Sequence, residues 1–360
     1  MSLLGSAWTM FSNWAMRWVM SMRDDSGGVG YYAARMTSAQ DILRTDVAGL
    51  TLRNPVILAA GTAGTLDEMA DVLDLSHVGA LVTKSITRSA RDGNETWRIV
   101  PVEAGMLNAI GLANVGIDAF ILDYAPRAAG VPTTVIGSIA GFSIDDYVRV
   151  AEAMDAVEAI GAVELNVSCP NVHNGCEFGT DPAMLSELVR EVRRVLQRTR
   201  MFVKLSPIAV GQPGIIAVAR AAVEPGGLPT GPNQRPGADA ICLTNTIPAM
   251  AIDVETRTPL LANKTGGFSG PGLHPVAVKL VHDVYRGLAK TTQTPLIGIG
   301  GVLRWEHAAE FILAGASAVE VGTVLFADPR SPLAIAKGLA KWVARQGHAN
   351  IAELVGAVKV

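Results

Sequence analysis

The stretch TTVIGSIAGFSIDDYVRVAEAMDAVEAIGAVELNVSCPN, residues 133–171, contains the unit from which the fold can be predicted. Its first part, 133–141, is almost entirely apolar or small, as expected of a strand that is buried on both faces. The amphipathic pattern over 143–160 predicts a helix, and a second apolar run follows at 162–168. We therefore predict a strand, a helix and a second, parallel strand, which is the βαβ unit of an α/β protein.

The same alternation runs along the chain from residue 45 onward, with another helical pattern at 182–199. We predict strands at 55–61, 79–85, 133–141, 162–168, 201–207, 239–245, 295–301 and 317–323. Eight such regular units favour a (β/α)8 TIM barrel, and a doubly wound sheet is the alternative. The segment DVAGLTLRN, 46–54, is expected to form a hairpin that closes the bottom of the barrel.

The first 36 of the 360 residues differ from the rest, and we predict an N-terminal extension before a barrel domain at 37–360. The extension holds Trp8, Trp14 and Trp18, and several of its apolar residues recur on one helical face. One interpretation is membrane contact through residues 1–22; the other, which we favour because no polybasic cluster is present, is an amphipathic or loosely ordered extension. The run is too short and polar for a membrane span and lacks the features of a signal peptide.

Composition narrows the class of protein. About half of the residues are hydrophobic (49%), the net charge is −3, and no basic run occurs, which argues against a nucleic-acid surface. The odd number of cysteines, Cys169, Cys176 and Cys242, fits a reducing compartment, so we predict a cytoplasmic protein. Three cysteines are too few for an iron–sulfur cluster, and no metal-binding spacing of His or Cys is present.

Polar and glycine residues gather at seven of the eight predicted strand ends, which form the catalytic face of a TIM barrel. Two of them are lysines, Lys84 and Lys204, and a buried lysine needs an anionic or electron-rich partner. The sequences GIGG, 298–301, and VGT, 321–323, would expose backbone N–H groups where barrels commonly hold a phosphate. We therefore expect a phosphorylated cofactor or substrate.

Four asparagines, Asn108, Asn166, Asn171 and Asn245, could recognise a planar ligand with imide-type edges. Cys169 lies among them and is predicted to be a proton-transfer group or a nucleophile. The alternative is a small buried apolar residue at a strand end. Cys176 is interpreted as an incidental loop thiol, and Cys242 as a core residue.

These motifs together resemble the dihydroorotate dehydrogenases, and the similarity extends over residues 45–357. The segments that carry it are GMLNAIGLANVG (105–116), NVSCPNVHNGCEFGTDP (166–182), VKLSP (203–207), LTNT (243–246), LANKTGGFSGP (261–271), GIGGV (298–302) and GASAVEVGT (315–323). They are most similar to the class 1, B-type branch. The resemblance implies an FMN-bearing barrel that oxidises dihydroorotate to orotate in the biosynthesis of the pyrimidine UMP.

The resemblance also implies residue roles. Cys169 would be the base, and Lys204 would stabilise charge on the reduced flavin while hydride moves to it. The implied substrate contacts are Lys84, Asn108, Asn166, Asn171, Asn245 and Thr246, with the backbone of Gly111 and Leu112. The implied FMN contacts are Lys84, Ser85, Ser138, Asn166, Lys204, Gly270, Gly300, Gly301, Gly322 and Thr323.

The chain departs from this family at several points. Ala60 stands where the family often has serine, Ser138 where it often has asparagine, and Ile208 where asparagine is usual. The segment EPGGLPTGPNQRPG, 224–237, resembles an insertion, which we expect on the face opposite the active site.

The partner and acceptor follow only from the resemblance. B-type enzymes pass electrons to NAD through a subunit that carries FAD and an iron–sulfur cluster, and we expect such a partner together with a homodimeric core. Fumarate or quinone is the alternative acceptor. The alternative functions are a related dihydropyrimidine-type dehydrogenase and a phosphate-binding barrel isomerase or lyase without flavin.

Overall fold

The computed structural model describes residues 42–168, 178–207 and 214–359. Eight strands form a closed barrel in the order β10-β15-β16-β3-β4-β7-β8-β9, and neighbouring strands are parallel. The barrel strands are β3 (Val56–Leu58), β4 (Ala80–Val82), β7 (Thr134–Ile139), β8 (Ile160–Asn166), β9 (Arg200–Leu205), β10 (Ala240–Leu243), β15 (Leu296–Ile299) and β16 (Ala318–Val321). This confirms the predicted TIM barrel and its eight strands, each within a few residues.

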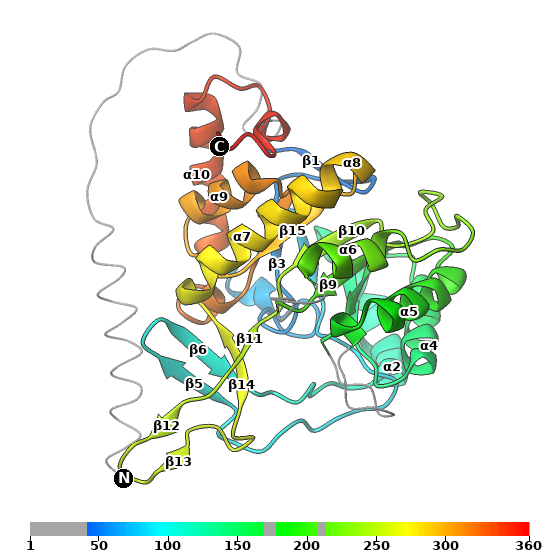
Figure 1. Ribbon diagram of the computed structural model, residues 1–360. Helices are drawn as coiled ribbons and strands as arrows, with labels where there is room; N and C mark the ends of the chain where they lie inside the picture. The colour runs from blue at the N-terminus through cyan, green and yellow to red at the C-terminus, as the bar shows by residue number, and fades with distance from the viewer. Residues whose placement is uncertain (1–41, 169–177, 208–213, 360) are drawn as a thin grey trace.

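Helices surround the barrel (Figure 1). The longer helices are α4 (Ile144–Asp155), α5 (Pro182–Val195), α6 (Ile215–Val223), α7 (His274–Val284), α9 (Trp305–Ala314) and α10 (Ser331–Arg345). The short ones are α2 (Ile117–Ala119), α3 (Ala125–Ala128) and α8 (Lys290–Thr292), with π-helical turns at Phe120–Tyr124 and Tyr285–Ala289. Further 3₁₀ turns lie at Glu68–Asp71, Leu75–His77, Phe178–Thr180, Pro271–Leu273, Thr323–Phe326 and Ile351–Leu354. Among the described residues, no helix has the length and apolar character needed to cross a membrane.

The two helices that the sequence predicted most clearly begin at side-chain caps. The Ser143 side chain accepts a hydrogen bond from the Asp146 backbone N–H at the start of α4. The Asp181 carboxylate accepts from the backbone N–H groups of Ala183 and Met184 at the start of α5, where Pro182 is the first helical residue. Such caps satisfy backbone donors that the helix leaves free, and proline is favoured at this position. The apolar face of each helix then packs against the barrel.

The bottom of the barrel is closed by an antiparallel hairpin, β1 (Thr45–Val47) and β2 (Leu50–Leu52), as predicted. Val47 and Leu52 belong to the apolar cluster that fills the lower barrel interior. The segment 224–237 lies at this end, because the Asn233 amide donates to the carbonyl oxygen of Ala48 at 2.8 Å. This confirms that the insertion is on the face opposite the strand ends.

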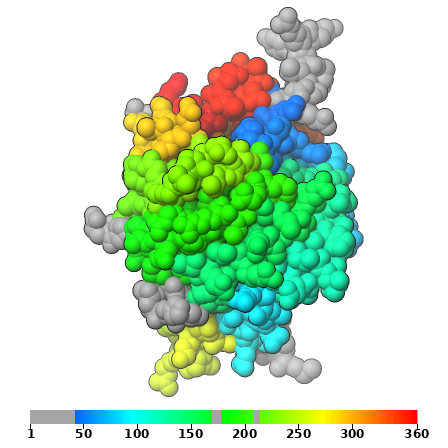
Figure 2. Space-filling view, turned by 90° about the vertical axis from the view of Figure 1, so that its right-hand side faces the viewer, coloured from blue at the N-terminus to red at the C-terminus, as the bar shows by residue number. Residues whose placement is uncertain are grey.

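A second sheet, which the sequence analysis did not predict, lies over the other end of the barrel. Its order is β11-β14-β6-β5, and we call these four strands the roof. They are β5 (Ile99–Val102), β6 (Gly105–Asn108), β11 (Ile247–Ala249) and β14 (Gly266–Ser269), and β12 (Ile252–Asp253) pairs with β13 (Thr258–Pro259) beyond them. In Figure 2 the cyan and yellow segments of this region protrude below the close-packed helices. The roof therefore covers the end of the barrel where the polar strand ends lie.

Candidate active site

A cavity of about 640 Å³ lies between the C-terminal strand ends and the roof. Many of the predicted site residues line it. These are Lys84, Ser85, Asn108, Gly111, Leu112, Asn166, Lys204, Asn245, Thr246, Gly300, Gly301, Gly322 and Thr323. Ser138 and Gly270 are buried behind the wall, whereas Cys169 and Asn171 fall outside the described residues. The structure thus brings most of the predicted site together, while the individual roles remain predictions.

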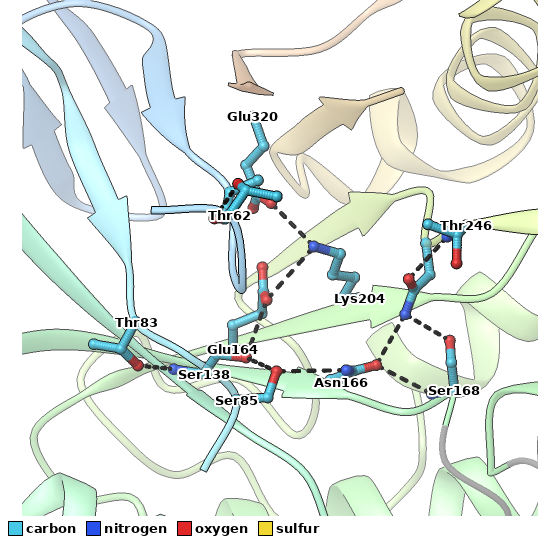
Figure 3. A network of polar contacts seen from close by, with 12 residues as sticks. Thr62, Thr83, Ser85, Ser138, Glu164, Asn166, Ser168, Lys204, Thr246 and Glu320 are labelled. Carbon is cyan, nitrogen blue, oxygen red and sulfur yellow. Dashed lines mark hydrogen bonds and ion pairs between the residues drawn. The ribbon is translucent and has the colours of Figure 1, made fainter. Parts of the chain in front are cut away.

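A chain of hydrogen bonds fixes the amides at the ends of β8 and β10. The Asn245 amide donates to the Asn166 side-chain oxygen and to the Ser168 hydroxyl, both at 3.0 Å. The Asn166 amide in turn donates to the Ser85 hydroxyl at 3.5 Å, and the Ser85 and Ser138 hydroxyls are 2.9 Å apart (Figure 3). Because each amide is held by its neighbour, the group is arranged before any ligand binds.

Asn108 links two strands of the roof where they border the cavity. It is the last residue of β6, and its side-chain amide donates to the carbonyl oxygen of Gly267 on β14 at 3.2 Å. Residues 108 and 267 are also register partners in the roof sheet. Asn108 therefore lines the cavity while its side-chain amide is held by the neighbouring strand.

Lys84, which follows β4, and Lys204 have pKa values shifted in opposite directions. Burial and the nearby positive charge of Arg98 lower the pKa of Lys84. Among the ion pairs within the described residues, none includes Lys84. A cavity-lining ammonium without a carboxylate partner is suited to bind an anionic ligand.

Lys204, in contrast, already has anionic partners inside the barrel. Its ammonium lies 3.1 Å from a Glu320 oxygen and 3.8 Å from a Glu164 oxygen. Burial alone would lower the pKa of Lys204, but the two glutamates outweigh burial and raise it. The sequence suggested that a ligand would supply the anionic partner of Lys204. In the structure the protein supplies part of it through Glu164 and Glu320. Neither glutamate was among the predicted site residues.

The glycine turn after β15 is held from behind by two histidines. Gly301 has φ of +63°, and an added Cβ would lie 2.7 Å from the Gly270 carbonyl oxygen, so both space and backbone geometry require glycine here. The His274 ring hydrogen-bonds the Gly300 carbonyl oxygen with one nitrogen and a Glu310 oxygen with the other, both at 2.9 Å. His274 thus supports the predicted phosphate turn without lining the cavity.

His307 lies beside His274, with the ring centroids 4.5 Å apart. Its Nδ1 accepts a hydrogen bond from the Leu303 backbone N–H, which requires an unprotonated Nδ1. Burial, and then the neighbouring His274, lower the pKa of His307 to about 4, so His307 stays neutral at physiological pH. Sequence reasoning missed both histidines because they contact backbone groups, the Gly300 carbonyl oxygen and the Leu303 N–H, and have no motif of their own.

The comparisons with known proteins agree with this geometry. A family model described as Dihydroorotate dehydrogenase matches residues 42–343. The chain belongs to this family. The protein described as dihydroorotate dehydrogenase B (NAD(+)), catalytic subunit, from Trichlorobacter lovleyi is 43% identical over 318 residues, covering 88% of this chain and 98% of that protein.

Other catalytic subunits with the same description are similarly related. The one from Pelobacter propionicus is 44% identical over 318 residues, which is 88% of this chain and 98% of its own length. The one from Desulforudis audaxviator is 46% identical over 314 residues, or 86% and 95% of the two chains. These relatives confirm the resemblance to dihydroorotate dehydrogenases of the class 1, B-type branch. The closed barrel excludes the doubly wound sheet.

Two departures from the family pattern can now be located. Ala60 lines the cavity, whereas Ser138 is buried behind it, where its hydroxyl lies between Ser85 and Glu164. Ile208 falls outside the described residues. Arg91 is a cavity residue that the motifs did not indicate, and its guanidinium lies 4.6 Å from the centre of the Phe142 ring. It places a positive charge at the cavity wall of this dihydroorotate dehydrogenase family member.

Proposed function

We propose that the chain oxidises dihydroorotate to orotate in pyrimidine biosynthesis, with Cys169 as the base and FMN as the hydride acceptor. The observation that supports this function best is one cavity lined by Lys84, Lys204, Asn245 and the Gly300–Gly301 turn, in a chain of the dihydroorotate dehydrogenase family. A lysine with no carboxylate partner, interlinked amides and a glycine turn are suited to an anionic, imide-bearing substrate next to a phosphorylated cofactor.

The residues present fit FMN. Gly300, Gly301 and Gly322 line one side of the cavity, where their backbone could approach a phosphate closely. Lys204 lies at the cavity floor, where its ammonium would face the pyrimidine end of the flavin. When bound, FMN supplies the ring that accepts a hydride. Ser85 and Asn166 would orient the ligands through the hydrogen bonds that they already make to one another.

Proton removal is the step that the protein itself performs. We propose that the Cys169 thiolate takes the proton from the substrate ring carbon next to the carbonyl, and that Lys84, Asn108, Asn171, Asn245 and Thr246 hold the ring in place. A free thiol titrates at about 8.5, so modest tuning suffices for it to act as a base. Roof residues such as Asn108 and Gly267 form part of the cavity wall above the strand ends.

The direct test of this function is the flavin content of the purified full-length protein. We expect a yellow protein with flavin absorbance and one FMN per chain, released intact on denaturation and identified by chromatography. A protein that is colourless and gains no flavin absorbance when titrated with FMN would refute the proposal.

Replacing Asn245 with alanine is expected to weaken orotate binding by about 1–3 kcal/mol, because polar groups of the bound ligand lose their partner. Flavin binding should change much less. Orotate affinity is measured by perturbation of the flavin spectrum.

Asn233→Ala is the matched control, since Asn233 bonds to Ala48 at the opposite end of the barrel. Equal orotate affinity in the Asn245 and Asn233 variants would show that Asn245 does not contact the substrate, and Asn108→Ala can be tested in the same way.

We further propose that electrons leave through a separate subunit that carries FAD and an iron–sulfur cluster, on a homodimeric, cytoplasmic core. The relatives described as NAD(+) catalytic subunits support such a partner, and the three cysteines of this chain cannot build a cluster alone. We expect the isolated chain to reduce NAD poorly and to do so efficiently only with that partner.

The test of the acceptor compares NAD, fumarate and a soluble quinone as oxidants in steady state. It uses the full chain and a variant without residues 1–36, the proposed extension outside the barrel domain of 37–360. If the full chain reduces quinone quickly and truncation abolishes only that activity, the proposal that electrons leave through a partner subunit is wrong. The proposed chemistry at Cys169 would be unaffected by that result.

A further inference from the structure

Four inward-facing residues form a buried cluster at the floor of the cavity. They come from four different barrel strands: Glu164 from β8, Lys204 from β9, Cys242 from β10 and Glu320 from β16. All four are buried, and Lys204 and Glu320 also line the cavity. Figure 3 shows the Lys204 ammonium between Glu164 and Glu320. One carboxylate oxygen of each glutamate and the Cys242 sulfur lie within 4.8 Å of one another. Such a group resembles a metal site, but here the Lys204 ammonium lies against both carboxylates and takes the place of the cation.

The charges in this cluster do not balance if both acids are ionised. Two carboxylates would face one ammonium, and the excess negative charge would be buried where its solvation is lost. Around the cluster, β3 and β15 present no ionisable side chain, and β7 contributes the Ser138 hydroxyl, 3.4 Å from a Glu164 oxygen. Beneath it, the barrel interior is apolar. Nothing among these neighbours compensates a second negative charge.

The hydrogen bonds of the two glutamates indicate where a proton that neutralises one of them would lie. One oxygen of each acid has a partner: Glu320 Oε2 accepts from Lys204, and Glu164 Oε1 accepts from Ser138. The other two oxygens, Glu164 Oε2 and Glu320 Oε1, are buried and have no hydrogen-bond partner. Two unpaired acceptors would be costly, whereas a carboxylic acid facing a carboxylate turns one of them into a donor.

We propose that Glu164 and Glu320 share one proton, which leaves the cluster neutral with Lys204 as a cation held at the cavity floor. The two acids are then positioning residues for Lys204, which would otherwise be a buried charge without a counterion. This geometry does not depend on any ligand. Only the consequence for flavin, that the acids moderate the positive charge it meets, rests on the proposed function.

The pKa directions of Glu320 and Cys242 agree with a shared proton. Burial, followed by the adjacent Glu164, raises the pKa of Glu320 well above its ordinary value of 4.5, which favours a protonated acid at neutral pH. Burial also raises the pKa of Cys242, so that residue contributes an uncharged thiol. The proton is assigned to the pair because both acids lie beside Lys204 and each has one buried oxygen without a hydrogen-bond partner.

The test compares Glu164→Gln, Glu320→Gln and the double variant in the full-length protein. Glutamine reproduces the shape and neutrality of a protonated glutamate, so each single variant keeps one carboxylate opposite Lys204. We expect the unfolding equilibrium constant of each single variant to stay within about tenfold of the original. The double variant should lose more than about 100-fold, because Lys204 is left buried and unpaired. Glu152→Gln, at an exposed pair with Arg149, is the control.

A second measurement keeps the proposal falsifiable if the double variant does not fold. Infrared spectroscopy should show one buried carboxylic acid in the original protein at neutral pH, retained in Glu152→Gln and lost in both single variants. A missing acid band, or a single variant more stable than the original, would mean that both acids are ionised and would overturn the proposal. So would single variants as unstable as the double variant.

The flavin readout separates this inference from the proposed function. If FMN binds as proposed, its reduction potential should stay close to the original value in each single variant and rise in the double variant, where Lys204 is no longer moderated. A protein that binds no flavin but shows the acid band would refute the function and leave the shared proton in place.

Discussion

Replacing Cys169 with alanine is expected to slow dihydroorotate oxidation by about 10²–10⁴-fold, the usual contribution of a general base. Flavin and orotate should still bind, because the variant would lose only the proposed proton acceptor. The measurement is the rate of flavin reduction in a single turnover, which isolates proton and hydride removal from the later oxidation by an acceptor. Cys169→Ser should keep part of the activity at high pH, because a hydroxyl needs a higher pH than a thiol to act as a base.

Cys176→Ala is the matched control for this experiment. The two cysteines belong to the same NVSCPNVHNGCEFG segment, but only Cys169 directly follows Ser168, whose hydroxyl contacts Asn245 in the cavity wall. The Cys176 variant should reduce flavin at the original rate. If the alanine variant of Cys169 turns over normally at neutral pH, or if only the Cys176 variant is slow, the assignment of the base is wrong.

Replacing Lys204 with methionine is expected to lower the free energy of unfolding by about 3–5 kcal/mol, since it removes the only cation from a buried ionic cluster. Glu164 and Glu320 then face each other without compensation. The measurement is denaturant unfolding monitored by tryptophan fluorescence. Lys279→Met is the control: Lys279 is exposed and pairs with Asp283 on the surface of α7, so its loss should matter by less than about 0.5 kcal/mol.

The Lys204 variant should also regain stability as the pH falls. The folded-state pKa of Glu320 is raised above the ordinary 4.5, so the folded protein binds more protons than the unfolded chain as pH increases past 4.5. The stability that comes from Glu320 is therefore fully present below about pH 4.5 and is lost as pH rises through the raised pKa. A Lys204 variant that is as stable as the Lys279 variant at every pH would contradict the ionic role of this cluster.

The barrel could be predicted because its signals are local. Each strand is a short apolar run, and helices such as α4 and α5 begin at caps that the sequence shows directly. The β1–β2 hairpin and the position of 224–237 also followed from their place in the chain. Regular alternation of such units leaves few other folds, so no long-range contact had to be foreseen.

The roof could not be predicted because its pairing is long-range. Its strands contain only three or four residues, and β6 pairs with β14, which joins Asn108 to Gly267, 159 residues apart in the chain. β14 begins with two glycines, which carry no strand pattern. Short strands with partly exposed residues give too little periodicity to distinguish them from loops.

Residues of the candidate site that belong to a recognisable motif could be predicted from the sequence. Residues that contact the cavity only by supporting another residue could not. Glu164 and Glu320 were visible as charges inside otherwise apolar strands, which is the one signal that could have revealed them. Nothing in the sequence placed them opposite Lys204, because three separate strands must close into a barrel first. His274 had no such signal, since it reaches the site only through the backbone of Gly300 and its other nitrogen bonds to Glu310 outside the cavity lining.

The roof has a consequence for how this protein could acquire a new specificity. Its two central strands come from insertions after β4 and after β10, and they share hydrogen bonds across the mouth. A change in the length of one insertion must therefore be matched in the other, or the shared edge is lost. A redesign of substrate choice would consequently exchange both insertions together. The barrel and its buried ionic cluster would stay unchanged.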